Sequence, residues 1–296
     1  MPHPEAFFLP VVDGGRGQRF CLLHPAQGDV SRGSILYVHP FAEEMNKSRR
    51  MAALQARALS HAGYAVLQID LLGCGDSSGD FGDAGWQDWV NDVALAYQWL
   101  STQSNARDTG LHRPRFWLWG VRAGCLLAVA AARQLDATCH FLFWQPTSSG
   151  KQLLQQFLRL KQAGNMLGGE TKGVMEGVRQ QLAHGSSVEI AGYLLSANLA
   201  SGLEQADLMP SASVGQTRRV EWFELSTREH ANVGLASTKT ITQWQQAGFK
   251  VDSHIVHGPA FWQTSEIEEA PGLIAATTKA VCAPEGDARQ VAKTGP

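Results

Sequence analysis

Short apolar runs alternate along the chain with stretches in which apolar residues recur every three or four positions. The runs are typical of buried strands, and the three-to-four periodicity is typical of helices with one buried face. Strands are predicted over residues 6–9, 19–24, 34–39, 65–70, 115–119, 139–144, 219–225 and 250–257. Helices are predicted over residues 49–62, 85–102, 123–135, 237–247 and 264–281. This alternation indicates a mostly parallel sheet covered by helices on both faces.

The alternation stops after Gln145-Pro146. Residues 147–213 are helical and amphipathic, with no run that would pair into the sheet, and a glycine-rich break follows the first helix at 164–169. We interpret this segment as a helical cap over the strand ends; the alternative is an ordinary crossover with long loops. The predicted organisation is a core of residues 1–146 and 214–282, a cap of residues 147–213 and a disordered polar tail of residues 283–296.

Composition limits the classes of function. The chain has 296 residues, of which 44% are hydrophobic and 18% charged, and its net charge of -2 argues against a nucleic-acid-binding surface. No apolar run reaches the roughly 20 residues of a membrane span, and the amino terminus does not resemble a signal peptide. The five cysteines are scattered without CxxC spacing, which favours free thiols over disulfides or a zinc site. We expect a cytoplasmic protein with no metal and no cofactor.

A sharp turn joins the strand at 115–119 to the helix at 123–135. Its sequence, WGVRAG over residues 119–124, has the glycine spacing of the Gly-x-Ser-x-Gly nucleophile elbow, with Arg122 in the place of the serine. A guanidinium stays protonated and is not a nucleophile. We therefore expect that the chain forms no seryl ester. Weaker candidate nucleophiles nearby are Cys74, Ser77, Ser78 and Cys125.

Four stretches carry a resemblance to known proteins. They are residues 39–49 (HPFAEEMNKSR), 70–79 (DLLGCGDSSG), 119–124 (WGVRAG) and 143–146 (FWQP). Together with the strand order they resemble the α/β-hydrolase fold and, within it, the exosortase A system-associated hydrolase 2 family, from about residue 7 to residue 280. The resemblance implies an eight-stranded α/β-hydrolase sheet with an inserted cap, and a link to bacterial exopolysaccharide synthesis and protein sorting. The resemblance also implies that an arginine at the elbow is a common feature of that family.

The fold implies where a base and an acid would follow the elbow. His257 ends the last predicted strand and is the candidate base; His254, inside that strand, is a weaker alternative. Glu229 lies in the loop after the strand at 219–225 and is the candidate acid, with Glu224 as its competitor. An acid in that position would orient the imidazole through its Nδ1–H group. Two alternatives stay open: His257 makes only a structural hydrogen bond, and neither glutamate takes part in catalysis.

Two backbone N–H groups are candidates for an oxyanion hole, those of Ala123 and Phe41. One such donor contributes roughly 3–4 kcal/mol in hydrolases. His39 is expected to support the loop that carries Phe41. Arg122 adds a positive charge that suits a carboxylate, phosphate or sulfate. Alternatively it forms an internal ion pair, for which the candidate carboxylates are Asp70, Glu43, Glu44 and Glu224.

Three hypotheses for function follow. The preferred one is a pseudo-hydrolase that binds a small anionic acyl, ester or glycan-type ligand at Arg122 without a covalent step. The second is an active ester or thioester hydrolase, or an acyltransferase, in which His257 is the general base for water or a hydroxyl. The third is a structural partner of proteins in the exopolysaccharide and exosortase pathway. The oligomeric state does not follow from the sequence.

Overall fold

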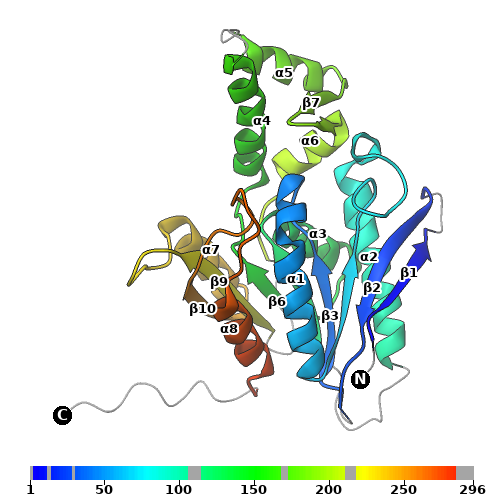
Figure 1. Ribbon diagram of the computed structural model, residues 1–296, viewed down its shortest axis with the longest axis vertical. Helices are drawn as coiled ribbons and strands as arrows, with labels where there is room; N and C mark the ends of the chain where they lie inside the picture. Colours follow the sequence, from blue (N-terminus) through cyan, green and yellow to red (C-terminus); the bar gives the residue numbers. More distant parts are fainter. Residues whose placement is uncertain are drawn as a thin grey trace.

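The computed structural model describes residues 3–11, 15–28, 31–105, 115–167, 173–210 and 218–284 (Figure 1). The strands in these ranges are β1 (Glu5–Pro10), β2 (Gln18–His24), β3 (Gly33–Val38), β4 (Tyr64–Ile69), β5 (Arg115–Val121), β6 (His140–Trp144), β7 (Val188–Ile190), β8 (Tyr193–Leu195), β9 (Arg219–Ser226) and β10 (Lys250–His257). The helices are α1 (Glu43–His61), α2 (Trp86–Asn105), α3 (Ala123–Leu135), α4 (Gly150–Leu167), α5 (Val174–Ala183), α6 (Ala197–Gln205), α7 (Leu235–Gln246) and α8 (Pro271–Cys282), with a 3-10 helix η1 (Phe81–Asp83).

Eight strands form one sheet in the order β1-β2-β4-β3-β5-β6-β9-β10. The pairs β1–β2 and β2–β4 are antiparallel, and every other neighbouring pair is parallel. The predicted mostly parallel sheet is therefore confirmed, with each of the eight predicted strands in it. Because the parallel strands end at the same edge, the loops after β3, β5, β6, β9 and β10 all leave from that edge.

Helices cover both faces of this sheet. On one face α1 and α8 pack over a core that includes Trp117, Trp119 and Phe223. On the other face α2, α3 and α7 pack over a larger core that includes Trp222 and Trp244. Strand residues alternate between the two faces, which is why Trp222 and Phe223, adjacent in β9, belong to different cores.

Two helices begin elsewhere than the sequence predicts. Helix α1 starts at Glu43 and not at residue 49; its first turn is acidic, which suits the positive end of the helix dipole but hides the apolar periodicity. Helix α8 starts at Pro271 and not at residue 264, because proline is favoured in the first turn and disfavoured further inside. Residues 264–270 are instead part of the loop between β10 and α8.

Between β6 and β9, which are neighbours in the sheet, the chain forms a separate layer that we call the insert (residues 150–205). It consists of α4, α5, α6 and a two-stranded β7–β8 hairpin that stays outside the main sheet. Figure 1 shows α4, α5, β7 and α6 beyond one end of the sheet. The apolar pattern does not predict the hairpin, and α4 runs through Gly164 to Leu167 where it predicts a break. The rest of that break, and tail residues 285–296, lie outside the described residues.

The insert contacts the core next to the loop after β3. The Phe157 ring of α4 lies edge-on to Phe41, with 5.0 Å between ring centroids, and Tyr193 packs on Phe81 in the same way. The Tyr193 hydroxyl also donates to Glu43 Oε2 at 2.9 Å. The insert therefore packs on the loop after β3, on η1 and on the first turn of α1. Among the described helices, none combines the length and the apolar character needed to cross a membrane.

Candidate active site at the elbow

The turn between β5 and α3 has the geometry of a nucleophile elbow. Arg122 has φ 53° and ψ -116°, a conformation that L-residues rarely adopt, and its N–H donates to Trp144 O at 3.0 Å. Gly124 lies against the end of β3, so that a Cβ atom on it would be 2.2 Å from Val38 O. The strained turn and the close glycine predicted from the sequence are both present, with an arginine at the apex.

The side chain of Arg122 is engaged within the protein. Its Nε and Nη2 atoms donate to the same oxygen of Glu44, Oε1, at 3.3 and 3.2 Å. Its Cζ atom lies 5.6 Å from the ring centroid of Trp262, in the loop between β10 and α8. Only 12% of the Arg122 side chain and 19% of the Glu44 side chain are exposed. The sequence leaves two partners open for Arg122, a ligand anion or a carboxylate of the protein. In the structure its partner is a carboxylate of the protein, that of Glu44.

The other three carboxylates considered for Arg122 have different donors. These donors are Arg49 for Asp70 (3.1 and 3.2 Å), Tyr193 for Glu43 (2.9 Å) and Trp222 Nε1 for Glu224 (2.9 Å). Glu44 alone among the four candidates contacts the guanidinium in the described structure. It does so from the first turn of α1.

Burial, more than the ion pair, sets the electrostatics of Glu44. Desolvation raises the pKa of its carboxyl above the ordinary value, and the neighbouring Arg122 offsets part of this rise. Two buried polar atoms beside the guanidinium have no hydrogen-bond partner among the described residues: Glu44 Oε2 and Trp262 Nε1. One is an acceptor and the other a donor, and leaving such groups unpaired is costly.

The two backbone donors predicted to form an oxyanion hole belong to the loop after β3 and to the first residue of α3. The N–H groups of Phe41 and Ala123 have no hydrogen-bond acceptor among the described residues, so both remain available as donors. His39 is buried; its Nδ1–H donates to Pro40 O at 2.8 Å, and Leu71 N–H donates to its Nε2 at 3.3 Å. Burial lowers the pKa of His39, which keeps the ring neutral and consistent with both bonds. His39 thus ties the loop after β3 to the loop after β4.

The candidate base, His257, does not contact Arg122 at the elbow in the described structure. His257 is the last residue of β10, which is three strands from β5 in the sheet order, or about 14 Å at ordinary strand spacing. Its side chain is exposed and lines a cavity that does not include Arg122. Reaching the elbow from β10 requires a residue of the returning loop, and the residue that does so here is Trp262. The adjacent Phe261 and Trp262, two large apolar residues just after His257, are the sequence signal for this.

The candidate acids are also away from Arg122. Glu229 is exposed and lines the same cavity as His257, with no hydrogen bond between them in the structure. Glu224 instead accepts from Trp222 Nε1. The weaker alternative base, His254, stacks on Phe223 at 4.4 Å and bonds through Nε2 to Glu221 Oε2 at 2.8 Å. The structure therefore does not assemble Arg122, His257 and either glutamate into a triad.

The weaker nucleophile candidates are structurally engaged. Burial raises the pKa of the Cys74 and Cys125 thiols far above their ordinary range, which leaves both protonated and unreactive. The Ser77 hydroxyl donates to Asp70 O at 2.5 Å, and Ser78 Oγ accepts from Gln18 N–H at 3.0 Å. In the part of the chain that the structure describes, no three His, Cys, Asp or Glu side chains are placed to hold a metal ion.

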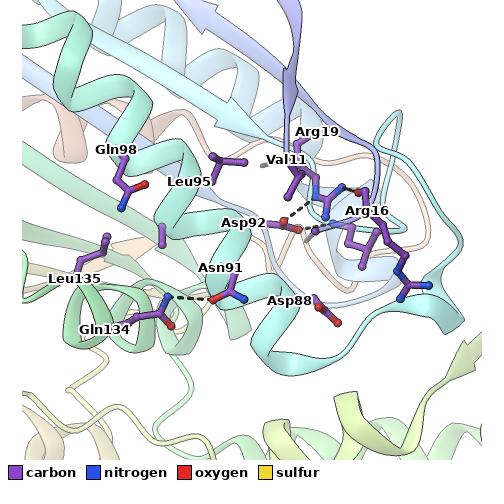
Figure 2. A pocket seen from close by; sticks show the side chains of 13 residues that line it. Val11, Arg16, Arg19, Asp88, Asn91, Asp92, Leu95, Gln98, Gln134 and Leu135 are labelled. Carbon is purple, nitrogen blue, oxygen red and sulfur yellow. Dashed lines mark hydrogen bonds and ion pairs between the residues drawn. The ribbon is translucent and has the colours of Figure 1, made fainter. Parts of the chain in front are cut away.

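A separate cavity of about 280 Å³ lies between β2, α2 and the end of α3 (Figure 2). Its charged groups are already paired: Arg19 Nε lies 2.7 Å from Asp92 Oδ1, and Leu72 N–H donates to Asp92 Oδ2 at 2.7 Å. Figure 2 shows this ion pair joining β2 to α2 at one end of the cavity. With 2% and 3% of the two side chains exposed, the pair is a structural tie between these elements.

Solved structures identify the fold. Est1E from Butyrivibrio proteoclasticus, solved with ferulic acid bound, aligns over 93% of this chain and 98% of its own, with a TM-score of 0.63 and 14% identity. A highly thermostable carboxyl esterase from Bacillus coagulans, in complex with glycerol, aligns over 95% and 97%, with a TM-score of 0.60 and 14% identity. An α/β serine hydrolase homologue from Coxiella burnetii aligns over 94% and 95%, with a TM-score of 0.50 and 13% identity. The expected α/β-hydrolase fold is therefore confirmed.

Sequence comparisons match a smaller part of the chain than the structural comparisons do. A region of 152 residues, 46% of this chain, is 27% identical to the human protein ABHD12B and spans 38% of that protein's length. The chain thus matches well under half of this relative. Profiles of known protein families give no match.

Proposed function

We propose that this chain, which has the α/β-hydrolase fold, is a pseudo-hydrolase that binds a small ligand through a carboxyl or similar anionic group at Arg122. The observation that carries the proposal is the cluster of Arg122, Glu44 and Trp262. Its guanidinium occupies the nucleophile position, and no imidazole contacts it in the described structure. Such an elbow offers hydrogen-bond donors to a ligand that competes with Glu44 for Arg122, but no route to a covalent intermediate.

The unpaired atoms of this cluster support binding. Glu44 Oε2 is a free acceptor and Trp262 Nε1 a free donor, both buried beside the guanidinium. A ligand carboxylate accepts from Trp262 Nε1, and a hydroxyl or N–H group elsewhere on the same ligand donates to Glu44 Oε2. The free N–H groups of Ala123 and Phe41 add further donors for negative charge. The aromatic contacts of Phe41 indicate an apolar surrounding that suits an acyl group.

Covalent inertness is tested by intact-protein mass spectrometry after incubation with a fluorophosphonate probe. The protein is expected to keep its unmodified mass, while a serine esterase in the same tube gains one probe per chain. A stoichiometric adduct on any serine contradicts the proposal, because it would reveal an activated nucleophile that the elbow does not supply.

Ligand binding is tested by calorimetric titration with octanoate, a simple acyl carboxylate. Glu44→Gln removes the charge that competes for Arg122, so octanoate is expected to bind this variant more tightly than the wild type. Glu43→Gln is the matched control, since the adjacent Glu43 bonds to Tyr193 and not to Arg122. Equal affinity in the wild type, Glu44→Gln and Arg122→Gln contradicts binding at this site.

One observation favours a second candidate, an ester or thioester hydrolase. The solved structures with this fold include esterases, and Glu229 and His257 line one cavity. In this alternative His257 acts as general base on water or a hydroxyl, without a seryl ester. Turnover of a thioester substrate that disappears in His257→Ala supports this candidate, and its absence leaves the pseudo-hydrolase.

The link to exopolysaccharide synthesis and the exosortase system is proposed on the resemblance of the four sequence stretches alone. It assigns the protein to the cytoplasm, with proteins of that pathway as partners. Co-purification of the tagged chain from a bacterium that carries such a locus tests it: recovery of proteins encoded in the locus is expected, and their absence argues against the link.

A further inference from the structure

A cavity of about 560 Å³ lies at the carboxyl ends of β9 and β10, and we call it the strand-end hollow. It is lined by Arg228, Glu229, His230, Ala231, Ile255 and His257. Arg122 is absent from this lining, and the strand that ends here, β10, is three strands from the elbow strand β5. The hollow is therefore separate from the elbow cluster of Arg122, Glu44 and Trp262.

Four ionisable side chains line the strand-end hollow without being paired. Among the described residues, no hydrogen bond or ion pair involves the side chains of Arg228, Glu229, His230 or His257. Glu224 of β9, by contrast, accepts from Trp222 Nε1. Unpaired groups that share one hollow are available to a ligand without first breaking an internal bond.

The loop that carries three of these groups has a defined shape. Arg228 N–H donates to Ser226 Oγ at 3.0 Å, which fixes the turn directly after β9. His230 has φ 55°, a left-handed conformation that is uncommon for a residue with a side chain. This loop and the end of β10 both lie at the carboxyl ends of the parallel strands β9 and β10.

The four groups together favour an anion. Arg228 is always positively charged, and the two imidazole rings beside it can donate N–H groups, against the single carboxylate of Glu229. A metal ion is disfavoured, because the described histidines and carboxylates do not form a group of three placed for coordination. Guanidinium and imidazolium groups both donate to oxyanions, with the shared chemistry of phosphate and carboxylate.

We propose that the strand-end hollow binds a small oxyanion, a phosphate or carboxylate group, through Arg228, His230 and His257. Glu229 weakens this binding because it holds a like charge beside the anion. Anion binding in the strand-end hollow is distinct from binding at the elbow cluster, so the two can be lost independently.

The experiment follows the histidine ring C–H signals of isotope-labelled protein by NMR at pH 5.5. Inorganic phosphate and, separately, acetate are titrated at constant ionic strength, and the signals of His230 and His257 are assigned from their asparagine variants. Saturable shifts of these two signals are expected. The anion that saturates at lower concentration identifies phosphate or carboxylate as the preferred group.

Three variants separate this proposal from non-specific salt effects. Arg228→Gln and His257→Asn are expected to weaken binding about fivefold or more, because each removes a hydrogen-bond donor to the anion. Glu229→Gln is expected to tighten it about threefold, the factor for one like charge some 6 Å away in water. Arg122→Gln, the matched control at the elbow, is expected to leave it unchanged. All four positions but the last are exposed, so their variants should fold, as thermal melting will verify.

Either of two results overturns the proposal. One is a histidine signal shift that rises linearly with anion concentration without saturating and is the same in the wild type, Arg228→Gln and Glu229→Gln. The other is saturable binding that is lost in Arg122→Gln and kept in Arg228→Gln, which would assign the anion to the elbow.

Discussion

Arg122 and Glu44 form an off-centre ion pair, in which two guanidinium nitrogens share one carboxylate oxygen at 3.3 and 3.2 Å and the other oxygen stays unpaired. An ideal arginine–carboxylate pair uses both oxygens. The pair therefore neutralises the charge at the elbow without satisfying the carboxylate. Glu44 Oε2 and Trp262 Nε1 stay unpaired beside the guanidinium, and a ligand can form hydrogen bonds with them.

Glu44→Gln tests this pair through pH. Burial raises the pKa of Glu44 in the folded protein above that in the unfolded chain, so the folded protein favours the protonated form. The contribution of Glu44 to stability is then full below the unfolded pKa and is lost as pH rises through the folded pKa. The free energy of unfolding of the wild type, relative to the non-titrating Glu44→Gln, should rise on going from pH 7 to pH 4.5.

Urea denaturation of both proteins at the two pH values measures this difference. Glu43→Gln serves as the control for general effects of acid on α1. If the free energy of unfolding of the wild type falls at low pH relative to that of Glu44→Gln, the prediction is contradicted. The attraction of Arg122 for the Glu44 carboxylate would then outweigh the cost of burying that carboxylate.

Gly124→Ala is expected to destabilise the protein by about 2–3 kcal/mol, because the new Cβ atom would lie 2.2 Å from the carbonyl oxygen of Val38. Gly177→Ala is the matched control: Gly177 lies within α5, and no atom lies within 4 Å of its added Cβ. That variant should be stabilised by about 0.5–1 kcal/mol. Equal melting temperatures for the two variants would contradict the close approach of α3 to β3.

The sequence predicts the sheet well, for a physical reason. Buried parallel strands are apolar on both faces, so each appears as a short run bounded by polar or glycine residues. Helix ends are less predictable: Glu43 and Pro271 begin helices α1 and α8 because of capping and dipole preferences that apolar periodicity does not report. The β7–β8 hairpin has only three residues in each strand, too few for a period of two to stand out.

The candidate site is predictable only in part. The elbow turn and its free backbone donors follow from Gly120, Gly124 and the strand-to-helix pattern. Strand order places His257 at the correct edge but says nothing about how far the following loop returns, and it is Trp262 that contacts Arg122. The partner of Arg122 is one of four candidate carboxylates, and sequence spacing cannot rank residues that approach from different elements.

Asp92→Asn should unfold the protein at markedly lower urea concentration, since it leaves Arg19 buried without its partner. Breaking one side of a buried pair costs about 3–5 kcal/mol. Glu204→Gln is the control: its pair with Lys151 spans 3.9 Å with both side chains more than half exposed, and its loss should change stability little. Comparable losses in the two variants would contradict the role of Arg19 and Asp92 in tying β2 to α2.

The central claim is that the elbow lacks both a nucleophile and a base within reach. Arg122→Ser restores the hydroxyl alone, and its hydrolysis of p-nitrophenyl acetate, measured beside the wild type, is the most direct test. We predict rates within about twofold of the wild type, because no imidazole contacts position 122 in the described structure and general-base catalysis contributes about 10²–10⁴-fold. A rise of a hundredfold or more that His257→Ala abolishes would contradict the claim and show that His257 serves the elbow.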